Sequence, residues 1–272
     1  MRAGEIFAFL GPNGAGKTTT VEILEGYRDR DAGEVSVLGV DPAAPTRAWR
    51  ERIGIVLQSG KLRPHLTVRE SVELFAGYYP APRPVDETIE LVGLTEQRDS
   101  RTERLSGGQQ RRLDVALALI GDPELLFLDE PTTGFDPSAR RNAWSLIAGL
   151  RQLGKTVFLT THYMDEAQEL ADRVAIIAAG QIVAEGAPSE LGGRGAAPCE
   201  IRFRLPEGAQ ADDLPLQVAV TDGRALLRTH DPIPALNALT SWALAQGVDL
   251  PGLEVERPSL EDVYLDLTEA RP

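Results

Sequence analysis

The chain of 272 residues is long enough for one large domain, or for one domain followed by a smaller one, with a buried core. Its net charge of −13 argues against a nucleic-acid binder, because such proteins normally present a basic face to phosphate groups. The single cysteine, Cys199, excludes an internal disulfide and a metal site built of cysteines alone, and it fits a reducing, cytoplasmic setting.

No apolar run reaches the roughly 18 residues that a membrane-spanning helix needs, and the longest runs, such as Val174–Ala179, are strand-sized. The first residues do not follow the basic-then-apolar pattern of a signal peptide. If the protein acts at a membrane, we therefore expect another chain to cross it.

The first motif is Gly-Pro-Asn-Gly-Ala-Gly-Lys-Thr-Thr at positions 11–19. Gly11, Gly16, Lys17 and Thr18 fit the P-loop pattern. Glycine lets backbone N–H groups approach a polyphosphate closely, and the N-terminus of the helix that follows favours negative charge. The motif therefore predicts nucleotide binding, with Lys17 at the β- and γ-phosphates and the Thr18 hydroxyl on Mg²⁺.

The residues around this motif predict an α/β arrangement. The apolar run Glu5–Leu10 predicts a buried strand, and Thr18–Leu24 predicts a helix. Gly33–Gly39 alternates between two glycines and predicts a strand with turns at both ends. Arg52–Leu57 predicts another strand, with Gln58 at its end, and a lone glutamine there carries no functional prediction by itself.

Helical spacing then replaces the strands. Thr67 followed by Glu70 forms a capping box ahead of a helix that ends near Tyr79. Three prolines interrupt the chain before helical spacing resumes over Val85–Val92. We expect a mostly helical insert over about 62–121 in the α/β domain.

The segment Leu105–Gln109, Leu-Ser-Gly-Gly-Gln, is called the signature segment below. It precedes a predicted helix from about Gln110 to Leu119, with Ser106 as N-cap. A helix N-terminus with glycines can hold an anion, but in isolation such a pentapeptide is more often only a polar cap.

The next strand ends in two carboxylates. Leu125–Glu130 predicts a buried strand that delivers Asp129 in the manner of a Walker B motif, where the aspartate helps to hold Mg²⁺, and Glu130 can accept a proton from an attacking water. A turn, a helix over about 139–152 and a strand over 156–160 follow, and His162 comes just after that strand. A lone histidine is more often structural than catalytic.

Taken in order, these motifs closely resemble the ATP-binding subunits of ABC transporters, over most of Arg2–Leu191. The signature segment shortly before the Asp-Glu pair is the specific sign. The resemblance implies that Glu130 is the general base, that His162 contacts the γ-phosphate, and that Gln58 couples the metal and water site to the helical insert. It also implies ATP and Mg²⁺ as cofactors, with Thr18, Gln58 and Asp129 at the metal. The nucleotide-binding residues would be Gly11, Pro12, Asn13, Gly14, Ala15, Gly16, Lys17, Thr18, Thr19, Ser106, Gly107, Gly108 and Gln109.

Members of this family work as head-to-tail dimers that enclose two ATP molecules between P-loop and signature segment. The resemblance thus implies that Ser106 and Gly108 contact the γ-phosphate bound to a second ATPase subunit, with Asp136 at the interface. It further implies an integral membrane permease as a separate chain, attachment through it to the cytoplasmic face of the membrane, and no nucleic-acid partner. Homodimer and heterodimer both stay open, and the transported substrate cannot be read.

A linker-like stretch separates the ATP-binding region from a tail. The tail has predicted strands at 200–205, 216–220, 225–229 and 253–256, a helix over about 234–246 and a capped helix from Pro258. We expect an ATP-binding domain over 1–191 and a small α/β appendage over 192–272. The tail, with Gly134–Pro137, resembles ATPase subunits of bacterial exporters of the daunorubicin-resistance type. For the appendage, a packing role is favoured over a ligand site.

Family members usually carry a longer segment before the P-loop strand, with an aromatic residue that stacks on adenine. The chain begins at Met1, so we expect the N-terminal strands of the fold to be truncated. Lost stacking of ~1–3 kcal/mol would weaken ATP binding by roughly one to two powers of ten. Two other functions are kept open beside the transport motor: a soluble ABC protein acting on ribosomes or DNA, and a non-hydrolysing regulatory subunit.

Overall fold

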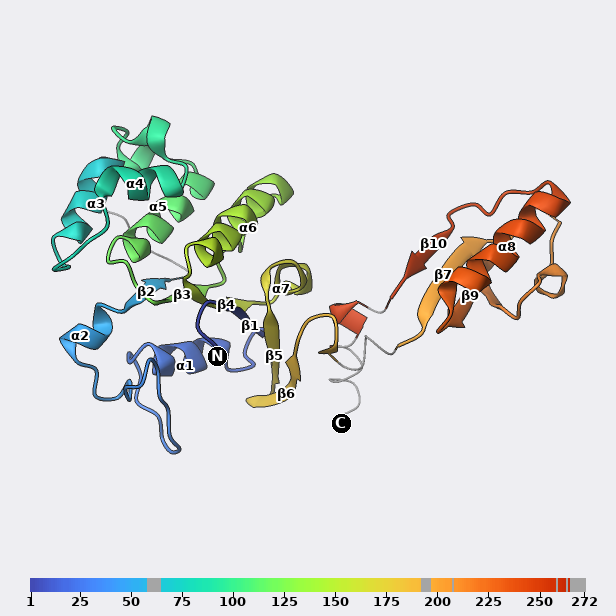
Figure 1. Ribbon diagram of the computed structural model, residues 1–272, viewed down its shortest axis with the longest axis horizontal. Helices are drawn as coiled ribbons and strands as arrows, with labels where there is room; N and C mark the ends of the chain where they lie inside the picture. Colours follow the sequence, from blue (N-terminus) through green and yellow to red (C-terminus); the bar gives the residue numbers. More distant parts are fainter. Residues whose placement is uncertain (58–64, 192–196, 207, 258, 263, 265–272) are drawn as a thin grey trace. The chain divides into compact units, whose positions relative to one another are not determined.

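The computed structural model describes residues 1–57, 65–191, 197–206, 208–257, 259–262 and 264 (Figure 1). They form two compact units, Met1–Pro188 and Ser189–Pro272. The first contains the P-loop, the signature segment and the carboxylate pair.

In the first unit, the described residues form a six-stranded sheet in the order β2-β3-β4-β1-β5-β6. Neighbours are parallel from β2 to β5, and only β6 runs antiparallel. The strands are β1 (Ile6–Leu10), β2 (Ile53–Val56), β3 (Leu125–Asp129), β4 (Thr156–Thr161), β5 (Arg173–Ala178) and β6 (Gln181–Gly186). Because parallel strands are covered on both faces, their sequences are almost continuously apolar, as predicted for β1, β2, β3 and β4.

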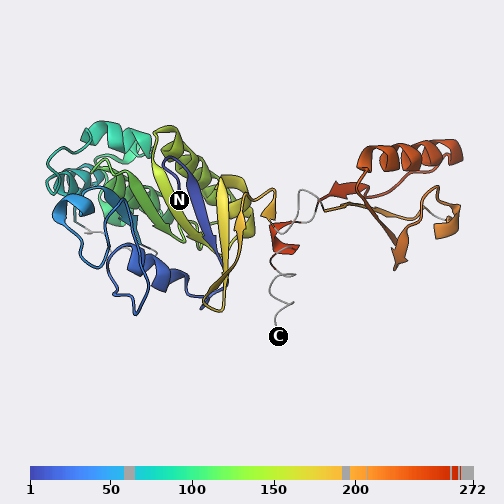
Figure 2. The same ribbon diagram turned by 60° about the horizontal axis from the view of Figure 1, so that its bottom comes forward.

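Helices cover both faces of this sheet. Helix α1 (Lys17–Leu24) lies on one face, and α6 (Pro137–Gln152) and α7 (Met164–Leu170) lie on the other (Figures 1 and 2). The short helix α2 (Arg47–Arg50) precedes β2. The carboxyl ends of β1, β3 and β4 therefore meet at one edge, which is where ligands bind in open α/β sheets.

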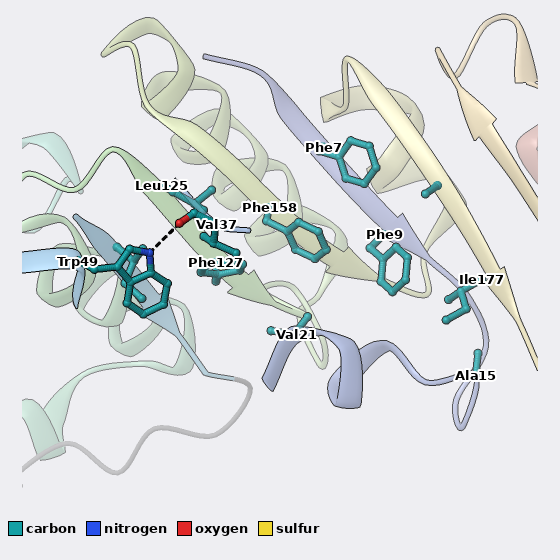
Figure 3. Close-up of a cluster of buried hydrophobic side chains, with 12 residues drawn as sticks. Phe7, Phe9, Ala15, Val21, Val37, Trp49, Leu125, Phe127, Phe158 and Ile177 are labelled. Atoms are coloured by element: carbon teal, nitrogen blue, oxygen red, sulfur yellow. Dashed lines mark hydrogen bonds between the residues drawn. The ribbon is translucent and has the colours of Figure 1, made fainter. Parts of the chain in front are cut away.

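An aromatic core lies between α1 and the sheet (Figure 3). Phe158 of β4 contacts Phe7, Phe9 and Phe127, with ring centroids 5.7–5.8 Å apart. Val21 from α1 and Ala15 from the P-loop join the same cluster. Burial of these rings fixes β1, and with it the start of the P-loop, against β3 and β4.

The predicted helical insert lies between β2 and β3. It contains α3 (Val68–Ala76), α4 (Val85–Leu91), the 3₁₀ turns η1 (Thr95–Gln97) and η2 (Thr102–Arg104), and α5 (Gly107–Leu119). The capping box predicted at Thr67 and Glu70 is present. Helix α5 also packs on β2, so the insert is joined to the sheet directly.

The strand predicted over Gly33–Gly39 is wrong. The segment has no extended ladder, and only an isolated bridge joins Val37 to Val40. Its alternation instead places Val37 in the aromatic core, where the backbone carbonyl accepts a hydrogen bond of 2.8 Å from the Trp49 indole (Figure 3). A side chain thus satisfies the carbonyl that a neighbouring strand would otherwise satisfy.

The second unit contains a small antiparallel sheet with one helix. Its described strands follow the order β10-β7-β9-β8, and Ile201, Phe203 and Leu239 are central in its core. The elements are β7 (Cys199–Arg204), η4 (Ala211–Asp213), β8 (Ala219–Thr221), β9 (Arg224–Thr229), α8 (Pro232–Gln246) and β10 (Glu254–Glu256). Ser259 and Asp262 make the reciprocal cap predicted for the last helix. Across both units, none of the helices in the described ranges has the length and apolar character needed to cross a bilayer.

Candidate functional site

The P-loop follows β1 directly, and glycine is required at two of its positions for different reasons. A Cβ on Gly11 would lie 2.5 Å from the carbonyl oxygen of Ile177, so the loop can pass β5 only without a side chain there. Gly16 has φ of 106° and caps α1. Only glycine adopts this conformation freely, and the first N–H groups of α1 then face the loop.

Lys17 fills the centre of the loop and is only 5% exposed. Its ammonium donates to the carbonyl oxygens of Gly11 at 2.8 Å and Pro12 at 3.2 Å. It also lies 3.4 Å from Oε1 of Glu130. The P-loop cation is thus paired with the second carboxylate of the Asp-Glu pair.

Thr160 on β4 holds the end of β3. Its hydroxyl donates to Oδ1 of Asp129 at 2.5 Å and accepts from the backbone N–H of Glu130 at 3.0 Å. The Glu130 N–H also points to the Thr160 carbonyl at 3.1 Å. These bonds hold Glu130 at φ of 44°, a conformation that is unfavourable for a residue with a side chain. One buried threonine therefore orients the Asp129 carboxylate and the backbone of Glu130.

The Glu130 carboxylate lies among polar side chains. Besides Lys17, Nδ1 of His162 lies 3.4 Å from Oε1, and the Thr133 hydroxyl donates to Oε2 at 3.1 Å. Burial raises the pKa of Glu130, but Lys17, His162 and Thr133 together outweigh burial, and the net pKa is lowered. At neutral pH the group is therefore a carboxylate, the form that a general base needs.

These residues share one cavity of ≈ 540 Å³ at the carboxyl ends of the strands. It is lined by Asn13, Gly14, Gly16, Lys17, Thr18, Thr19, Glu130, Thr133 and His162. The structure thus brings together the P-loop, the proposed base and the histidine, although His162 lies 32 positions after Glu130 in the sequence.

The signature segment lies elsewhere. Ser106, Gly107, Gly108 and Gln109 line a second cavity of ≈ 500 Å³, together with Asp136. Ser106 caps α5 and forms a reciprocal capping box with Gln109. The described residues place nothing within 4 Å of a Cβ added to Gly107 or Gly108, so packing against these residues does not explain the two glycines.

Two further predicted site residues are Asp136 and Gln58. Oδ1 of Asp136 accepts from the N–H groups of Ser138 at 2.8 Å and Ala139 at 2.9 Å, which caps α6. Gln58 lies outside the described residues, and its role stays a prediction.

Sequence reasoning missed Arg111, the buried link between α5 and the end of β3. Its guanidinium donates to the carbonyl oxygens of Asp129 at 2.8 Å and Pro131 at 3.2 Å, and also to that of Leu57. Burial lowers its pKa below the ordinary value. The two adjacent arginines on α5 gave no sign of which one is buried. Thr160 was also missed, because threonine is common in strands and the sequence gave no sign of a special role for this one.

The residues proposed for Mg²⁺ have suitable donor atoms. Thr18 offers a hydroxyl in the P-loop cavity, and Asp129 offers a carboxylate already oriented by Thr160. Mg²⁺ prefers such oxygen donors and keeps water and phosphate oxygens for its other positions, so a small protein donor set fits it.

Comparison with known families agrees with this geometry. The family model described as ABC transporter matches residues 1–133. A second model, described as ABC transporter domain-containing protein-like, C-terminal domain, matches residues 199–259. The two matches fall in the first and the second unit respectively.

Individual proteins are similar over nearly the whole chain. The Nod factor export ATP-binding protein I of Burkholderia orbicola is 39% identical, with 98% of this chain and 89% of that protein covered. The daunorubicin resistance ATP-binding protein DrrA3 of Streptomyces coeruleorubidus is 38% identical, with 97% and 87% covered. Among solved structures, the dimeric post-hydrolysis state of an ATP-binding cassette bound to ADP and Pi has a TM-score of 0.61 and 27% identity, with 69% of this chain and 87% of that one covered. The chain therefore belongs to the family of ABC transporter ATP-binding subunits, with their P-loop NTPase fold, and it is an ATPase.

Proposed function

We propose that this ATPase drives an export-type ABC transporter from the cytoplasmic face of the membrane, with a separate permease chain forming the path for the substrate. The names of the two relatives, which describe Nod factor export and daunorubicin resistance, support an export system. In this proposal, ATP binding closes a head-to-tail dimer of two copies and hydrolysis opens it.

The proposal of a dimer rests on the separation of the two cavities. Lys17, Glu130 and His162 lie around one, whereas Ser106 and Gly108 line the other. Gly107 and Gly108 leave open space that no described residue fills. A second copy, turned head to tail, would bring its signature segment to the P-loop cavity and complete the site. The similar cassette that was solved as a dimer with ADP and Pi supports a dimer of this chain as well.

The roles within the site follow from charge and position. Glu130 accepts a proton from the attacking water, because its pKa is lowered and its carboxylate faces the P-loop cavity. Lys17 and the first N–H groups of α1 bind the phosphates, and His162 orients the γ-phosphate. Thr18, Asp129 and Gln58 would hold Mg²⁺, which would neutralise charge on the phosphates.

This division of roles suits phosphoryl transfer, in which the protein mainly positions water and neutralises charge. The proposed energy coupling is a population shift: ATP binds the closed dimer better than the open one, so binding favours closure. The geometry around Glu130 favours a hydrolysing motor over a non-hydrolysing regulatory subunit. Nζ of Lys17 and Nδ1 of His162 each lie 3.4 Å from Oε1 of the proposed base Glu130.

The test is the variant Glu130→Gln. We expect ATP turnover to fall by at least about 100-fold, because the variant has no carboxylate to accept the proton. ATP affinity should stay within about twofold of wild type, and size-exclusion chromatography with ATP should show a stable dimer. Glu169→Gln, at an exposed position on α7, is the matched control and should behave as wild type. Normal turnover by Glu130→Gln would overturn the assignment of the base.

A further inference from the structure

The imidazole of His162 needs more support than its contact with Glu130 supplies. Its Nδ1 lies 3.4 Å from Oε1 of Glu130, which is longer than a well-formed hydrogen bond. The side chain is 30% exposed and turns about two single bonds, so packing on its open side does not fix it. Contacts with other side chains must therefore hold the ring at the P-loop cavity.

The ring of Tyr163, the next residue, lies against this imidazole. The two ring centroids are 4.0 Å apart, and the ring planes are inclined by 41°. Consecutive side chains of an extended chain point to opposite sides, so this contact requires a bend after β4. The Thr161 hydroxyl holds that bend, because it accepts a hydrogen bond of 2.9 Å from the backbone N–H of Tyr163.

A second contact holds the Tyr163 ring from another helix. The Arg140 guanidinium extends from α6, and its Cζ lies 4.1 Å from the centroid of the Tyr163 ring. The Arg140 side chain is 22% exposed and also pairs with Oδ2 of Asp165 at 3.3 Å. A cation over a tyrosine ring is attracted to the ring face, and the attraction grows as water is excluded. Tyr163 is thereby tied to α6 as well as to the end of β4.

We propose that Tyr163 is a positioning residue for ATP hydrolysis, which with Arg140 holds the His162 imidazole toward Glu130 and the γ-phosphate. Tyr163 and Arg140 do not belong to the lining of the P-loop cavity, whereas His162 does. They therefore act on the reaction through the orientation of the imidazole. Displacing a catalytic group by about 1 Å can cost up to roughly 100-fold in rate, so weak contacts that fix a ring affect turnover.

The alternative role for these side chains is packing of α7 against α6 alone. Packing would lower stability when it is lost, but it would not act through His162. The inference rests on the proposed function, because it takes the role of His162 at the γ-phosphate from there. The experiment therefore tests His162 and Tyr163 separately and together.

The first measurement is ATP turnover of the full chain. In Tyr163→Leu we expect kcat to fall about tenfold and KM to change by less than about twofold, because the phosphates bind to the P-loop. Tyr163→Phe keeps the ring and should stay within about twofold of wild type. In the His162→Ala background, Tyr163→Leu should lower kcat no further, since residues that act through one another are not additive.

Arginine variants test the second contact and need no change at Tyr163. Arg140→Met keeps the stem but removes the cation, and we expect kcat to fall at least about threefold. Arg141→Met is the matched control, because Arg141 is the exposed neighbour on α6. Asp165→Asn removes the ion pair but leaves the guanidinium over the ring. Both should turn over ATP as wild type does, and Arg140→Met keeps the proposal testable if Tyr163→Leu does not fold.

The second measurement follows the imidazole itself by NMR without nucleotide. The chain has three histidines, so the Cε1 proton of His162 is assigned by its loss in His162→Ala. A proton over an aromatic ring is shifted upfield, and we expect this shift in wild type and in Tyr163→Phe. In Tyr163→Leu the signal should move toward the position of a free histidine. A role in packing alone would leave kcat unchanged.

Two results would overturn the proposal while His162→Ala is impaired. One is a normal kcat in Tyr163→Leu, and the other is a loss in Tyr163→Leu that adds in full to the loss in His162→Ala. An imidazole signal that is the same in wild type and Tyr163→Leu would also overturn it. Normal turnover of His162→Ala would instead overturn the proposed role of His162, and the NMR signal would still decide whether Tyr163 holds the ring.

Discussion

At the scale of single residues, one threonine contacts both members of the Asp-Glu pair. The Thr160 hydroxyl contacts Asp129 and the N–H of Glu130, and no other side chain in the described ranges makes both contacts. In Thr160→Val, which keeps the shape but lacks the hydroxyl, we expect kcat for ATP hydrolysis to fall roughly 10–100-fold. The KM for ATP should change by less than about threefold, because phosphate binding lies with the P-loop.

The control for this prediction is Thr156→Val on the same strand. Thr156 is equally part of β4, and its hydroxyl accepts from the N–H of Gly4 at 3.0 Å, far from the carboxylates. Both variants should lose stability of about 1 kcal/mol per lost hydrogen bond, but only Thr160→Val should lose turnover. Equal kcat for the two variants would show that Thr160 contributes to stability alone.

Glu25 makes the stability of the chain depend on pH in a definite direction. Burial raises its pKa from 4.5 to about 8, so in this window the folded protein holds a proton that the unfolded chain has lost. Stability contributed by the protonated group is therefore lost as pH rises through the window. Compared with Glu25→Gln, which cannot ionise, the wild-type melting temperature should fall between about pH 5 and about pH 9. A difference that stays constant with pH would mean that Glu25 has a counter-charge in solution.

At the scale of elements, Arg111 joins the signature helix to the strand that ends in the carboxylates. It extends from α5 to the carbonyl groups of Asp129 and Pro131, on either side of Glu130. In Arg111→Met these buried acceptors lose their donor, and we expect a loss of about 2–4 kcal/mol in the free energy of unfolding. Turnover should fall as well, since Glu130 lies between the two carbonyl groups that are released.

Arg112→Met is the matched control, because the hydrogen bond of Arg112 to the described residues is a 3.3 Å contact with the Gly93 carbonyl at the surface. Its free energy of unfolding should change by less than about 1 kcal/mol. Chemical denaturation measures both variants. If Arg111→Met were as stable and as active as Arg112→Met, the hydrogen bonds between α5 and the end of β3 would contribute neither to the free energy of unfolding nor to turnover.

The elements near the site could be predicted from sequence because their local signals agree with their final packing. The strands β1, β2, β3 and β4 have apolar centres, and the sequence shows the capping box at Thr67 and the N-cap at Ser106. The segment around Val37 was mistaken for a strand because apolar and polar residues also alternate in a loop that packs two side chains into the core. Arg111 and Thr160 could not be predicted, since their partners are backbone atoms brought near by the tertiary fold.

At the scale of the whole molecule, the two units have separate cores, one around Phe158 and the other around Phe203. The candidate site residues lie in the first unit, which matches the ABC transporter family over residues 1–133. Within that unit, the signature segment and the P-loop line different cavities. The central claim is therefore that a complete hydrolytic site needs two copies of the chain.

Mixing two inactive variants tests this claim most directly. Lys17→Ala removes the P-loop cation, and Gly108→Asp blocks the signature segment. A head-to-tail dimer of one copy of each contains one site with a native P-loop and a native signature segment. Equal mixing should therefore restore ATP turnover to about a quarter of wild type, since about half of the dimers are mixed and each has one of two sites intact. If the mixture stays as inactive as each variant alone, the site does not form between two copies and the account is wrong.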